Sequence, residues 1–423
     1  MNLIVNAGKL GGSIAVPGSK SHTIRAAAFA MMADGISKIH SPLLSQDTLS
    51  AVGAARAFGA EVERGDDSCW LVKGTAGRLR DPGKVVDMAN SGTSIKIFAG
   101  LAALCPFPVQ FDGDESLRSR PMEHLLSALR LLNVETESTG KKCPFTVKGP
   151  MTGRRTEVNS ESSQYVTALL MSTPFAAQDT IIDVVNLNEQ PYIEITLGWL
   201  DKMGIRYSRT EDLSRFEIPG GQRISAFELT IPADFSTATF PLVAAGITQS
   251  ELKIRNLDFS DRQGDKAVFS YLEKMGMEII RGEQSTIVRP HGQLKGVELD
   301  LNATPDALPA IAVAAAAAEG ITEIRNVAQA RIKETDRIAC MTRELRKMGI
   351  QIEEHEDGMT VHGGRLTGSA VNSYKDHRIA MALAVAGLAA EGETLIRDAE
   401  CAAVTYPGFI ADFNRLGANF RQF

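Results

Sequence analysis

The chain has 423 residues, of which 44% are hydrophobic and 23% are charged, and its formal net charge at pH 7 is −6. This length exceeds one ordinary hydrophobic core and predicts two domains of about 200 residues each. The acidic balance argues against nucleic acid or an anionic membrane as the main partner, because both favour a basic surface.

The five cysteines show no metal-ligand spacing, and their number is odd. We interpret them as free thiols in a reducing compartment, so we expect a cytoplasmic protein without a structural metal. The alanine-rich stretch 311–318 is too short to span a bilayer and indicates a buried helix.

One pattern occurs six times along the chain, with a period of roughly 70 residues. Its recurring tail includes Lys202-Met-Gly, Lys274-Met-Gly and Lys347-Met-Gly. Each copy is expected to form a βαβαββ unit. Features that most units share indicate scaffold, whereas features that a single unit carries are candidates for chemistry.

The first helix of each unit is followed by small apolar residues, which is typical of a helix that is buried on all sides. In chain order these helices are expected to begin near Lys20, Ser91, Ser163, Ser236, Asp306 and His377. The second helices are expected to begin at Asp47, Pro121, Pro191, Asp265, Asp336 and Pro407, which are cap-like residues or first-turn prolines.

Six such units predict an α/β (α+β) fold of two domains. Each domain would hold three units around a pseudo-threefold, with the helices inside and the sheets outside. The predicted first domain comprises residues 1–13 and 232–423, and the second comprises residues 14–231. The chain would cross between them near residues 12–20 and 228–236, and we expect the ligand site in the cleft between the domains.

Helix N-termini attract anions, and three units carry unusual basic residues near such termini. The candidate cations are Lys20, Arg25, Arg120, Lys333, Arg337 and Arg378. Together they could hold two phosphates or carboxylates, because the guanidinium fork binds planar oxyanions with two hydrogen bonds. Other readings stay open: the serines at the helix starts could be ordinary N-caps, and the charged motifs could be salt-bridged faces or structural networks.

The order of these motifs along the chain carries a family resemblance. They are Pro17-Gly-Ser-Lys-Ser, Asn90-Ser-Gly-Thr, Arg120-Pro, Ser162-Ser-Gln, Pro191-Tyr, Pro305-Asp, Lys333-Glu-Thr-Asp-Arg and Asp376-His-Arg. Together they resemble the 5-enolpyruvylshikimate-3-phosphate synthases over nearly the whole chain. The resemblance implies transfer of the enolpyruvyl group from phosphoenolpyruvate to the 5-hydroxyl of shikimate 3-phosphate, with release of phosphate.

The resemblance also implies the site residues. Those implied for shikimate 3-phosphate are Lys20, Ser21, Arg25, Ser162, Ser163, Gln164, Tyr192, Asp306, Gln329 and Lys333. Those implied for phosphoenolpyruvate are Lys20, Asn90, Gly92, Thr93, Arg120, Gln164, Arg337, His377 and Arg378.

The implied catalytic residues are Lys20, Asp306 and Glu334. Addition needs a base at the 5-hydroxyl, which matches Asp306, and an acid at the enol methylene, which matches Glu334. No cofactor or metal is expected, because the enol phosphate is already activated. Four positions depart from the family pattern. Glu189 replaces a serine and Val404 a lysine, while Gln329 stands in place of an asparagine and Lys375 in place of an asparagine or glycine.

Three other functions are weighed against this one. A divergent relative could act on another shikimate-like metabolite, and the same fold could use UDP-N-acetylglucosamine as acceptor, although the reactive cysteine motif of that family does not occur here. A non-catalytic phosphometabolite-binding protein would lose Asp306 or Glu334 before the arginines, yet both are present. The resemblance favours a monomer.

Overall fold

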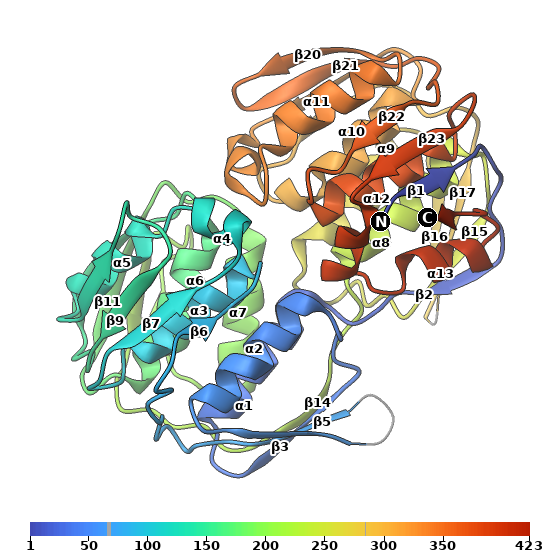
Figure 1. The fold of residues 1–423 in the computed structure, drawn as a ribbon. Coiled ribbons are helices and arrows are strands. Elements are labelled where there is room, and N and C mark those ends of the chain that lie inside the picture. The colour runs from blue at the N-terminus through green and yellow to red at the C-terminus, as the bar shows by residue number, and fades with distance from the viewer. Residues whose placement is uncertain (66–68, 284) are drawn as a thin grey trace. The chain divides into compact units, whose positions relative to one another are not determined.

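The structure is a computed structural model that describes residues 1–65, 69–283 and 285–423. The chain divides into two compact units (Figure 1). Met1–Pro17 and Pro232–Phe423 form one, here called the C-unit, and Gly18–Ile231 form the other, here called the N-unit.

The N-unit contains three copies of the repeated pattern. Its helices are α1 (Lys20–Met32), α2 (Gln46–Ala57), α3 (Gly92–Ala102), α4 (Glu115–Ser119), α5 (Glu123–Arg130), α6 (Ser163–Ser172), the 3-10 helix η1 (Thr173–Phe175) and α7 (Gln190–Lys202). Its strands are β3 (Ile36–His40), β4 (Glu61–Arg64), β5 (Cys69–Lys73), β6 (Val86–Asp87), β7 (Val109–Asp112), β8 (Glu135–Ser138), β9 (Phe145–Lys148), β10 (Arg154–Asn159), β11 (Thr180–Val185), β12 (Ser208–Arg209), β13 (Arg215–Ile218) and β14 (Glu228–Thr230).

The C-unit contains the other three copies and the start of the chain. Its helices are α8 (Phe235–Ile247), η2 (Gly264–Lys266), α9 (Ala267–Lys274), η3 (Pro305–Ala307), α10 (Leu308–Ala316), η4 (Ala328–Ile332), α11 (Arg337–Lys347), α12 (His377–Gly387), η5 (Ala399–Val404) and α13 (Phe409–Arg415). Its strands are β1 (Leu3–Val5), β2 (Ser13–Ala15), β15 (Leu252–Arg255), β16 (Met277–Arg281), β17 (Ser285–Pro290), β18 (Glu298–Asp300), β19 (Ile321–Arg325), β20 (Gln351–His355), β21 (Gly358–His362), β22 (Ala370–Asn372), β23 (Thr394–Arg397) and β24 (Arg421–Gln422).

Six four-stranded sheets are built from these strands, three in each unit. Their orders are β14-β3-β5-β4, β6-β7-β9-β8 and β10-β11-β13-β12 in the N-unit, and β16-β17-β15-β2, β18-β19-β21-β20 and β22-β23-β1-β24 in the C-unit. Among the described strands each sheet has one parallel pair, such as β10 with β11, and two antiparallel pairs. The predicted mixed α/β architecture is confirmed.

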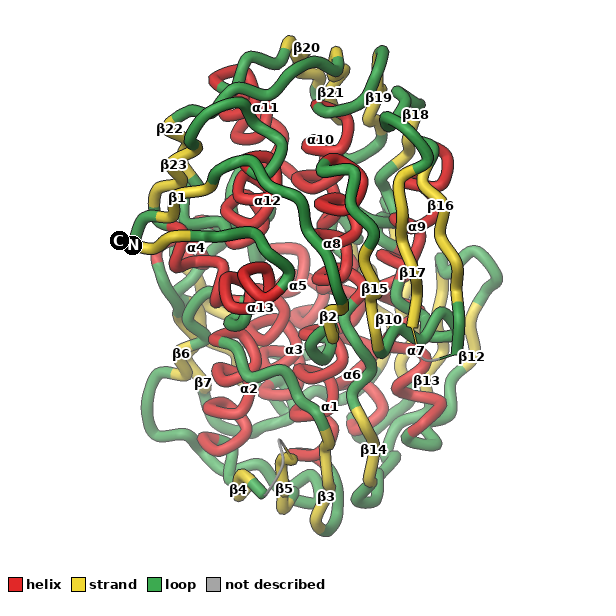
Figure 2. The backbone as a smooth tube through the Cα atoms, turned by 90° about the vertical axis from the view of Figure 1, so that its right-hand side faces the viewer, coloured by secondary structure: helices red, strands yellow, loops and turns green. Residues whose placement is uncertain are grey.

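Small residues allow the first helices to be buried on all sides. In α10 every residue is buried, and five of its nine residues are alanine. The helices α8, α10 and α12 contact one another in the C-unit, with strands on the outside (Figure 2). In the N-unit α3 contacts both α1 and α6. The apolar side chains form two separate cores, one in each unit.

Two edge strands lie in different sheets from those that chain order alone would indicate. Strand β2 precedes α1, yet it pairs in parallel with β15 in the C-unit. Strand β14 precedes α8, yet it pairs in parallel with β3 in the N-unit. The chain passes between the units after Pro17 and again after Ile231, and these boundaries lie within the predicted ranges 12–20 and 228–236.

Several helices begin one or two residues away from the predicted starts. In α2 and α8 the reason is that another side chain caps the helix. The N-cap of α2 is Ser45, which forms a capping box with Thr48, and not Asp47. Helix α6 begins at Ser163, as predicted, and Ser162 is its N-cap. The N-cap of α8 is Asp234, whose carboxylate accepts a hydrogen bond from the Thr237 amide at 3.2 Å.

Similarly, Asp265 lies inside η2 and does not cap it. Asp336 caps α11 as predicted, accepting from the Ala339 amide at 3.0 Å.

Candidate active site

Lys20 lies in the first turn of α1 and contacts the start of α2. Its Nζ lies 3.1 Å from Oδ2 of Asp47, and both side chains are largely buried. The predicted cap residue of α2 is therefore a counter-ion. The pair holds the ammonium group in one place, which is what a residue that binds or protonates a substrate requires.

Arg25 is a buried cation whose hydrogen bonds, within the part of the chain that the structure describes, are all to neutral oxygens. It donates to the hydroxyls of Thr196 and Thr167 and to the backbone oxygens of Ser21 and Tyr192, at 2.9–3.3 Å. Burial lowers the pKa of Arg25 to about 10. An anion bound beside it would offset that desolvation. Ser21 and Tyr192, both predicted site residues, thus contribute backbone oxygens to this cluster.

Arg120 lies against the start of α3. Its Nη2 donates to Oδ1 of Asn90 at 3.0 Å and to the Ser116 hydroxyl at 3.2 Å. A Cβ atom placed on Gly92 would come within 2.6 Å of Nη1 of Arg120. The absence of a side chain at Gly92 therefore leaves the room that the guanidinium occupies, and the structure brings three predicted site residues together.

Gln164 links α6 to α3 and connects to a cation outside the predicted set. Its Nε2 donates to the Thr93 hydroxyl at 3.1 Å, and its Oε1 accepts from Nζ of Lys96 at 2.8 Å. Lys96 is 3% exposed and lies over the ring of Tyr165. The signal that could have identified it is a single lysine within the apolar helix sequence Ile95-Lys-Ile-Phe98.

The start of α6 holds a carboxylate. Ser162 and Ser163, both predicted to bind shikimate 3-phosphate, donate to Oε2 of Glu189. The Ser163 amide donates to the same oxygen at 3.0 Å. Glu189 is 1% exposed and immediately precedes α7. These serines therefore do more than cap the helix, since they bind an anion of the chain itself.

In the C-unit, Arg337 is the centre of a cluster of carboxylates. Its Nε donates to Oδ2 of Asp376 at 2.8 Å, its Nη1 to Oδ1 of Asp306 at 2.9 Å, and its Nη2 to Oε2 of Glu334 at 2.5 Å. The Thr335 hydroxyl also donates to Asp376 at 3.1 Å. Arg337 is fully buried, so this charge-assisted network fixes its position.

Opposing effects set the pKa of Asp376. Burial is the largest single effect and raises it, but the charge and the hydrogen bond of Arg337, with a smaller contribution from His377, together bring the pKa below its ordinary value. Burial by itself would lower the pKa of Arg337, yet the three carboxylates raise it. Arg337 and Asp376 therefore both carry their charge in the folded protein.

Arg378, in the first turn of α12, joins the same cluster. Its Nη2 donates to Oδ2 of Asp306 at 2.8 Å, so two arginines bind the two oxygens of Asp306. Its backbone amide donates to Asp376, the N-cap of α12. His377, which lies between them in sequence, is buried.

A further buried carboxylate lies close to this cluster. The Ser236 hydroxyl donates to Oδ2 of Asp265. Burial and the charge of Asp306 raise the pKa of Asp265 to about 6, against a smaller lowering by Arg378. Asp265 was predicted only as a helix start, because nothing in its local sequence indicates that α8 and η3 bring it near Asp306.

Gln329 and Lys333 lie at η4. The Gln329 amide is buried and donates to the backbone oxygen of Asn302 at 3.0 Å. Lys333 is the half-buried residue that follows η4, directly before Glu334 and the Arg337 cluster. The predicted residues of the C-unit therefore lie within one stretch of chain around Arg337, with Asp306 and Arg378 brought to it by η3 and α12.

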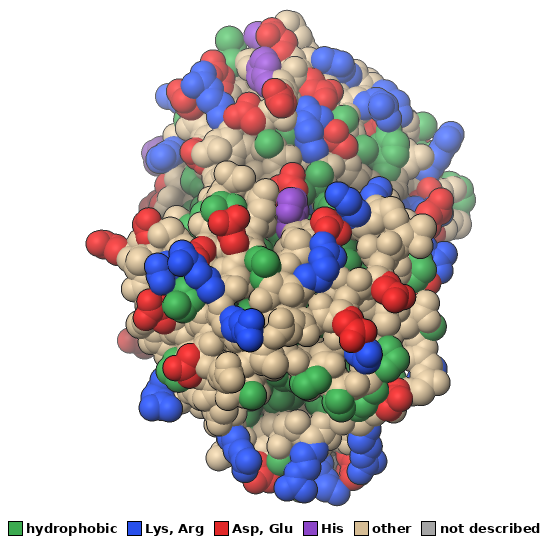
Figure 3. Space-filling view, turned by 90° about the vertical axis from the view of Figure 1, so that its left-hand side faces the viewer, with side chains coloured by type: hydrophobic (Ala, Val, Ile, Leu, Met, Phe, Trp, Pro, Cys, Tyr) green, Lys and Arg blue, Asp and Glu red, His purple; other side chains and the backbone are tan. Residues whose placement is uncertain are grey.

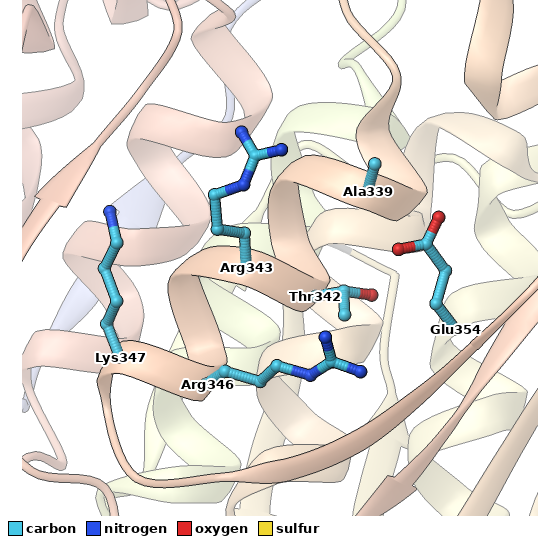
Figure 4. A pocket seen from close by; sticks show the side chains of 6 residues that line it. All are labelled: Ala339, Thr342, Arg343, Arg346, Lys347 and Glu354. Atoms are coloured by element: carbon cyan, nitrogen blue, oxygen red, sulfur yellow. The ribbon is translucent and has the colours of Figure 1, made fainter.

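A groove of about 440 Å³ on α11 lies outside the predicted set (Figure 4). It is lined by Arg343, Arg346 and Glu354 among others. Arg346 donates to the backbone oxygen of Ile352, as Arg56 does to that of Val62 in the first repeat. These arginines join a second helix to the next strand, so we assign the groove to the repeated scaffold.

The remaining surface fits the composition of the chain. Acidic and basic side chains are interspersed over the face shown in Figure 3. Within the described residues, no helix is long and apolar enough to cross a membrane. The same residues contain no group of three or more His, Cys, Asp or Glu side chains that could hold a metal ion.

Comparison with known proteins relates these motifs to one family. The family model described as EPSP synthase (3-phosphoshikimate 1-carboxyvinyltransferase) matches residues 4–413. The chain is 47% identical to the 3-phosphoshikimate 1-carboxyvinyltransferase of Acetivibrio thermocellus, over 99% of each chain. It is 44% identical to that of Methanocella arvoryzae over 96% of each.

A solved structure has the same fold. The EPSP synthase of Acinetobacter baumannii superposes with a TM-score of 0.83 at 27% identity, over 99% of each chain. The repeated architecture and the two polar clusters thus occur in a chain that resembles these enzymes from end to end. The chain belongs to the EPSP synthase family.

Proposed function

We propose that this chain is a 3-phosphoshikimate 1-carboxyvinyltransferase, which transfers the enolpyruvyl group of phosphoenolpyruvate to the 5-hydroxyl of shikimate 3-phosphate and releases phosphate in aromatic biosynthesis. Family membership over residues 4–413 supports the reaction. The structural observation that supports this function is that the buried Arg337 binds both Asp306 and Glu334, the two carboxylates proposed to move protons.

The proposed reaction consists of an addition step and an elimination step, each with two proton transfers. In the addition step, Asp306 takes the proton of the acceptor hydroxyl while the hydroxyl oxygen attacks C2 of phosphoenolpyruvate. Glu334 protonates the methylene carbon. In elimination Glu334 removes a proton from the resulting methyl group and the C–O bond to phosphate breaks. Asp306 returns its proton to the departing phosphate oxygen, and the enol double bond forms again. No redox step occurs, and we propose no cofactor, because the enol phosphate supplies the activated group.

The arginine contacts explain how substrate binding would prepare the base. In this structure Arg337 and Arg378 bind the two oxygens of Asp306, which stabilises its ionised form. A phosphoenolpyruvate anion would compete for the same guanidinium donors. As these hydrogen bonds pass to the substrate, Asp306 becomes more basic and can accept the hydroxyl proton.

The binding roles follow the resemblance, and the local contacts agree with them. Arg25 is a buried cation among neutral oxygens, as an anion subsite requires. Arg120, Gly92 and Asn90 form one cluster at the start of α3, which we assign to phosphoenolpyruvate. The positioning of Lys20 by Asp47 suits a residue that contacts both substrates.

Both compact units are required in this proposal. The proposed residues of the N-unit bind anions, whereas Asp306 and Glu334 belong to the C-unit. We therefore keep the expectation that one pair of substrates engages both sets. We also keep the cytoplasmic location, which the five buried free cysteines support, and the monomeric state, which rests on the resemblance.

The deciding experiment measures phosphate release from phosphoenolpyruvate with and without shikimate 3-phosphate. Release should require shikimate 3-phosphate and should disappear in Glu334→Gln, whose amide cannot move a proton. Glu353→Gln, at an exposed glutamate of β20, serves as the matched control and should keep the wild-type rate. Release without the acceptor, or full activity in Glu334→Gln, would contradict the proposal.

A further inference from the structure

The carboxylate of Glu189 already occupies the N-terminus of α6. Its Oε2 accepts hydrogen bonds from the Ser163 hydroxyl at 2.7 Å, the Ser163 amide at 3.0 Å and the Ser162 hydroxyl at 3.3 Å. Three donors therefore converge on one oxygen atom of a side chain that is 1% exposed. We call these three donors the α6 anion seat.

The α6 anion seat offers what a phosphate oxygen needs. Two hydroxyls and a free helix amide point to one position, and the helix dipole favours negative charge there. The proposed function assigns Ser162 and Ser163 to shikimate 3-phosphate. A phosphate group and the Glu189 carboxylate cannot use the same three donors together, because each donor would then serve two like charges.

The backbone around Glu189 is fixed independently of its side chain. The Asn188 amide donates to the Ser160 oxygen at 3.2 Å, and the Ser160 amide donates to the Val185 oxygen at 2.8 Å. Among the described residues, the buried Ser160 hydroxyl has no hydrogen-bond partner, so one more donor lies in this segment. The side chain of Glu189 can therefore change position while the loop before α7 keeps its path.

We propose that Glu189 is a built-in competitor for the phosphate of the acceptor. Its carboxylate occupies the α6 anion seat in the unliganded chain, and shikimate 3-phosphate binds by displacing it. Glu189 thereby sets the affinity for the phosphorylated acceptor and admits only a ligand whose anion binds the seat more strongly than a carboxylate. This inference rests on the proposed function and adds the residue that regulates access to its acceptor subsite.

The test compares Glu189→Ser and Glu189→Gln with the wild type. Neither variant has a charge to compete for the seat, and the glutamine preserves the shape of the side chain. Glu161→Gln is the matched control, because Glu161 directly precedes Ser162 but contacts His124 at 3.2 Å. The KM for each substrate is measured by phosphate release, and the Kd for shikimate 3-phosphate and for inorganic phosphate by calorimetry.

We expect both Glu189 variants to lower the KM and the Kd for shikimate 3-phosphate by about tenfold, which corresponds to one exchanged charged interaction. The KM for phosphoenolpyruvate should stay unchanged, and Glu161→Gln should behave as the wild type. Melting temperatures show whether each variant is folded, and Glu189→Gln decides the outcome if Glu189→Ser is unstable.

Two results would overturn the inference. Weaker binding of shikimate 3-phosphate by folded variants would make Glu189 a ligand of the substrate. Faster turnover of an unphosphorylated acceptor by the wild type would mean that the seat excludes phosphate. If the proposed function is wrong, none of the proteins will show acceptor-dependent release of phosphate. Calorimetry with inorganic phosphate would still measure whether an anion displaces the Glu189 carboxylate.

Discussion

Arg337 shows how the charges of single residues are balanced in the C-unit. Asp376 is fully buried and binds Nε of Arg337, whereas Asp306 and Glu334 are partly exposed and bind the other nitrogens. Breaking a buried pair such as Arg337–Asp376 leaves an uncompensated charge, which is strongly destabilising. We infer that Asp376 fixes the guanidinium, while the two more accessible carboxylates are the ones that substrate anions can displace.

At Gly92 the expected effect is steric. In Gly92→Ala the new methyl group would lie 2.6 Å from Nη1 of Arg120, so the guanidinium has to move. We expect the KM for phosphoenolpyruvate to rise by about 10- to 100-fold, since small displacements at a binding group are costly. The KM for shikimate 3-phosphate should change much less. Steady-state kinetics with each substrate varied in turn measures both.

Gly53→Ala is the control for that substitution. Gly53 lies in α2, and a Cβ there meets no atom within 4 Å, so this variant should keep both KM values. An unchanged KM for phosphoenolpyruvate in Gly92→Ala would show that Arg120 does not bind that substrate.

At the scale of elements, some contacts recur between the repeated units and others differ. Arg56 and Arg346 occupy equivalent places and join a second helix to the next strand in two different units. The start of α8 differs, because its Ser236 binds Asp265 of η2 and brings a carboxylate near Asp306. The Ser236–Asp265 contact is therefore a feature in which one unit differs from the common repeat, just as some sequence motifs occur in one unit and not in the others.

The burial of Asp265 beside Asp306 predicts a pH-dependent stability. The pKa of Asp265 is raised to about 6, above the value of about 3.9 in an unfolded chain. The folded protein therefore keeps a proton that the unfolded chain releases, so the free energy of unfolding falls as the pH rises from about 4 to 6. Asp265→Asn should be more stable than the wild type by about 2 kcal/mol at pH 8 and equal to it at pH 4.

Urea unfolding of both proteins across this pH range measures the difference. Glu278→Gln, which removes an exposed carboxylate beside Arg289, is the control and should change the stability by less than about 0.5 kcal/mol at either pH. A constant difference between Asp265→Asn and the wild type at all pH values would refute the raised pKa.

At the scale of the whole molecule, two edge strands pair in a different unit from the helix that follows them in the chain. Strand β2 leads into α1 of the N-unit but pairs with β15 of the C-unit, and β14 does the converse. Strand β1 completes the last sheet by pairing with β23 and β24. Both ends of the chain are therefore built into the C-unit, which consists of two segments, whereas the N-unit is the continuous segment Gly18–Ile231.

The proposed monomeric state predicts the result of mixing inactive variants. Lys20→Met removes a proposed catalytic residue of the N-unit, and Glu334→Gln removes one of the C-unit. If each chain works alone, an equimolar mixture should show no more phosphate release than the two proteins measured separately. A wild-type protein mixed with the double variant, at half of the total concentration, is the control and should keep half of the activity.

Recovery of activity in the mixture of the two single variants would contradict the monomer. It would mean that an intact N-unit set from one chain acts together with an intact C-unit set from another.

Much of the site could be predicted from local sequence. The motifs around Lys20, Asn90, Ser162, Lys333 and Asp376 stand at helix starts, where capping and the helix dipole give polar residues a recognisable pattern. Lys96 and Asp265 could not be assigned in this way. Their roles depend on contacts with Gln164 and with the surroundings of Asp306, which lie far away in the sequence.

The sequence by itself determined the six repeats, the buried first helices and the family motifs, because periodicity and helix ends are local properties of the chain. Only the tertiary structure decided which sheet takes β2 and β14, since strand pairing joins distant segments. It alone also showed that Asp306 and Glu189 accept hydrogen bonds from the donors that we assign to substrate anions. Such charge pairing depends on burial and distance, which a sequence pattern does not contain.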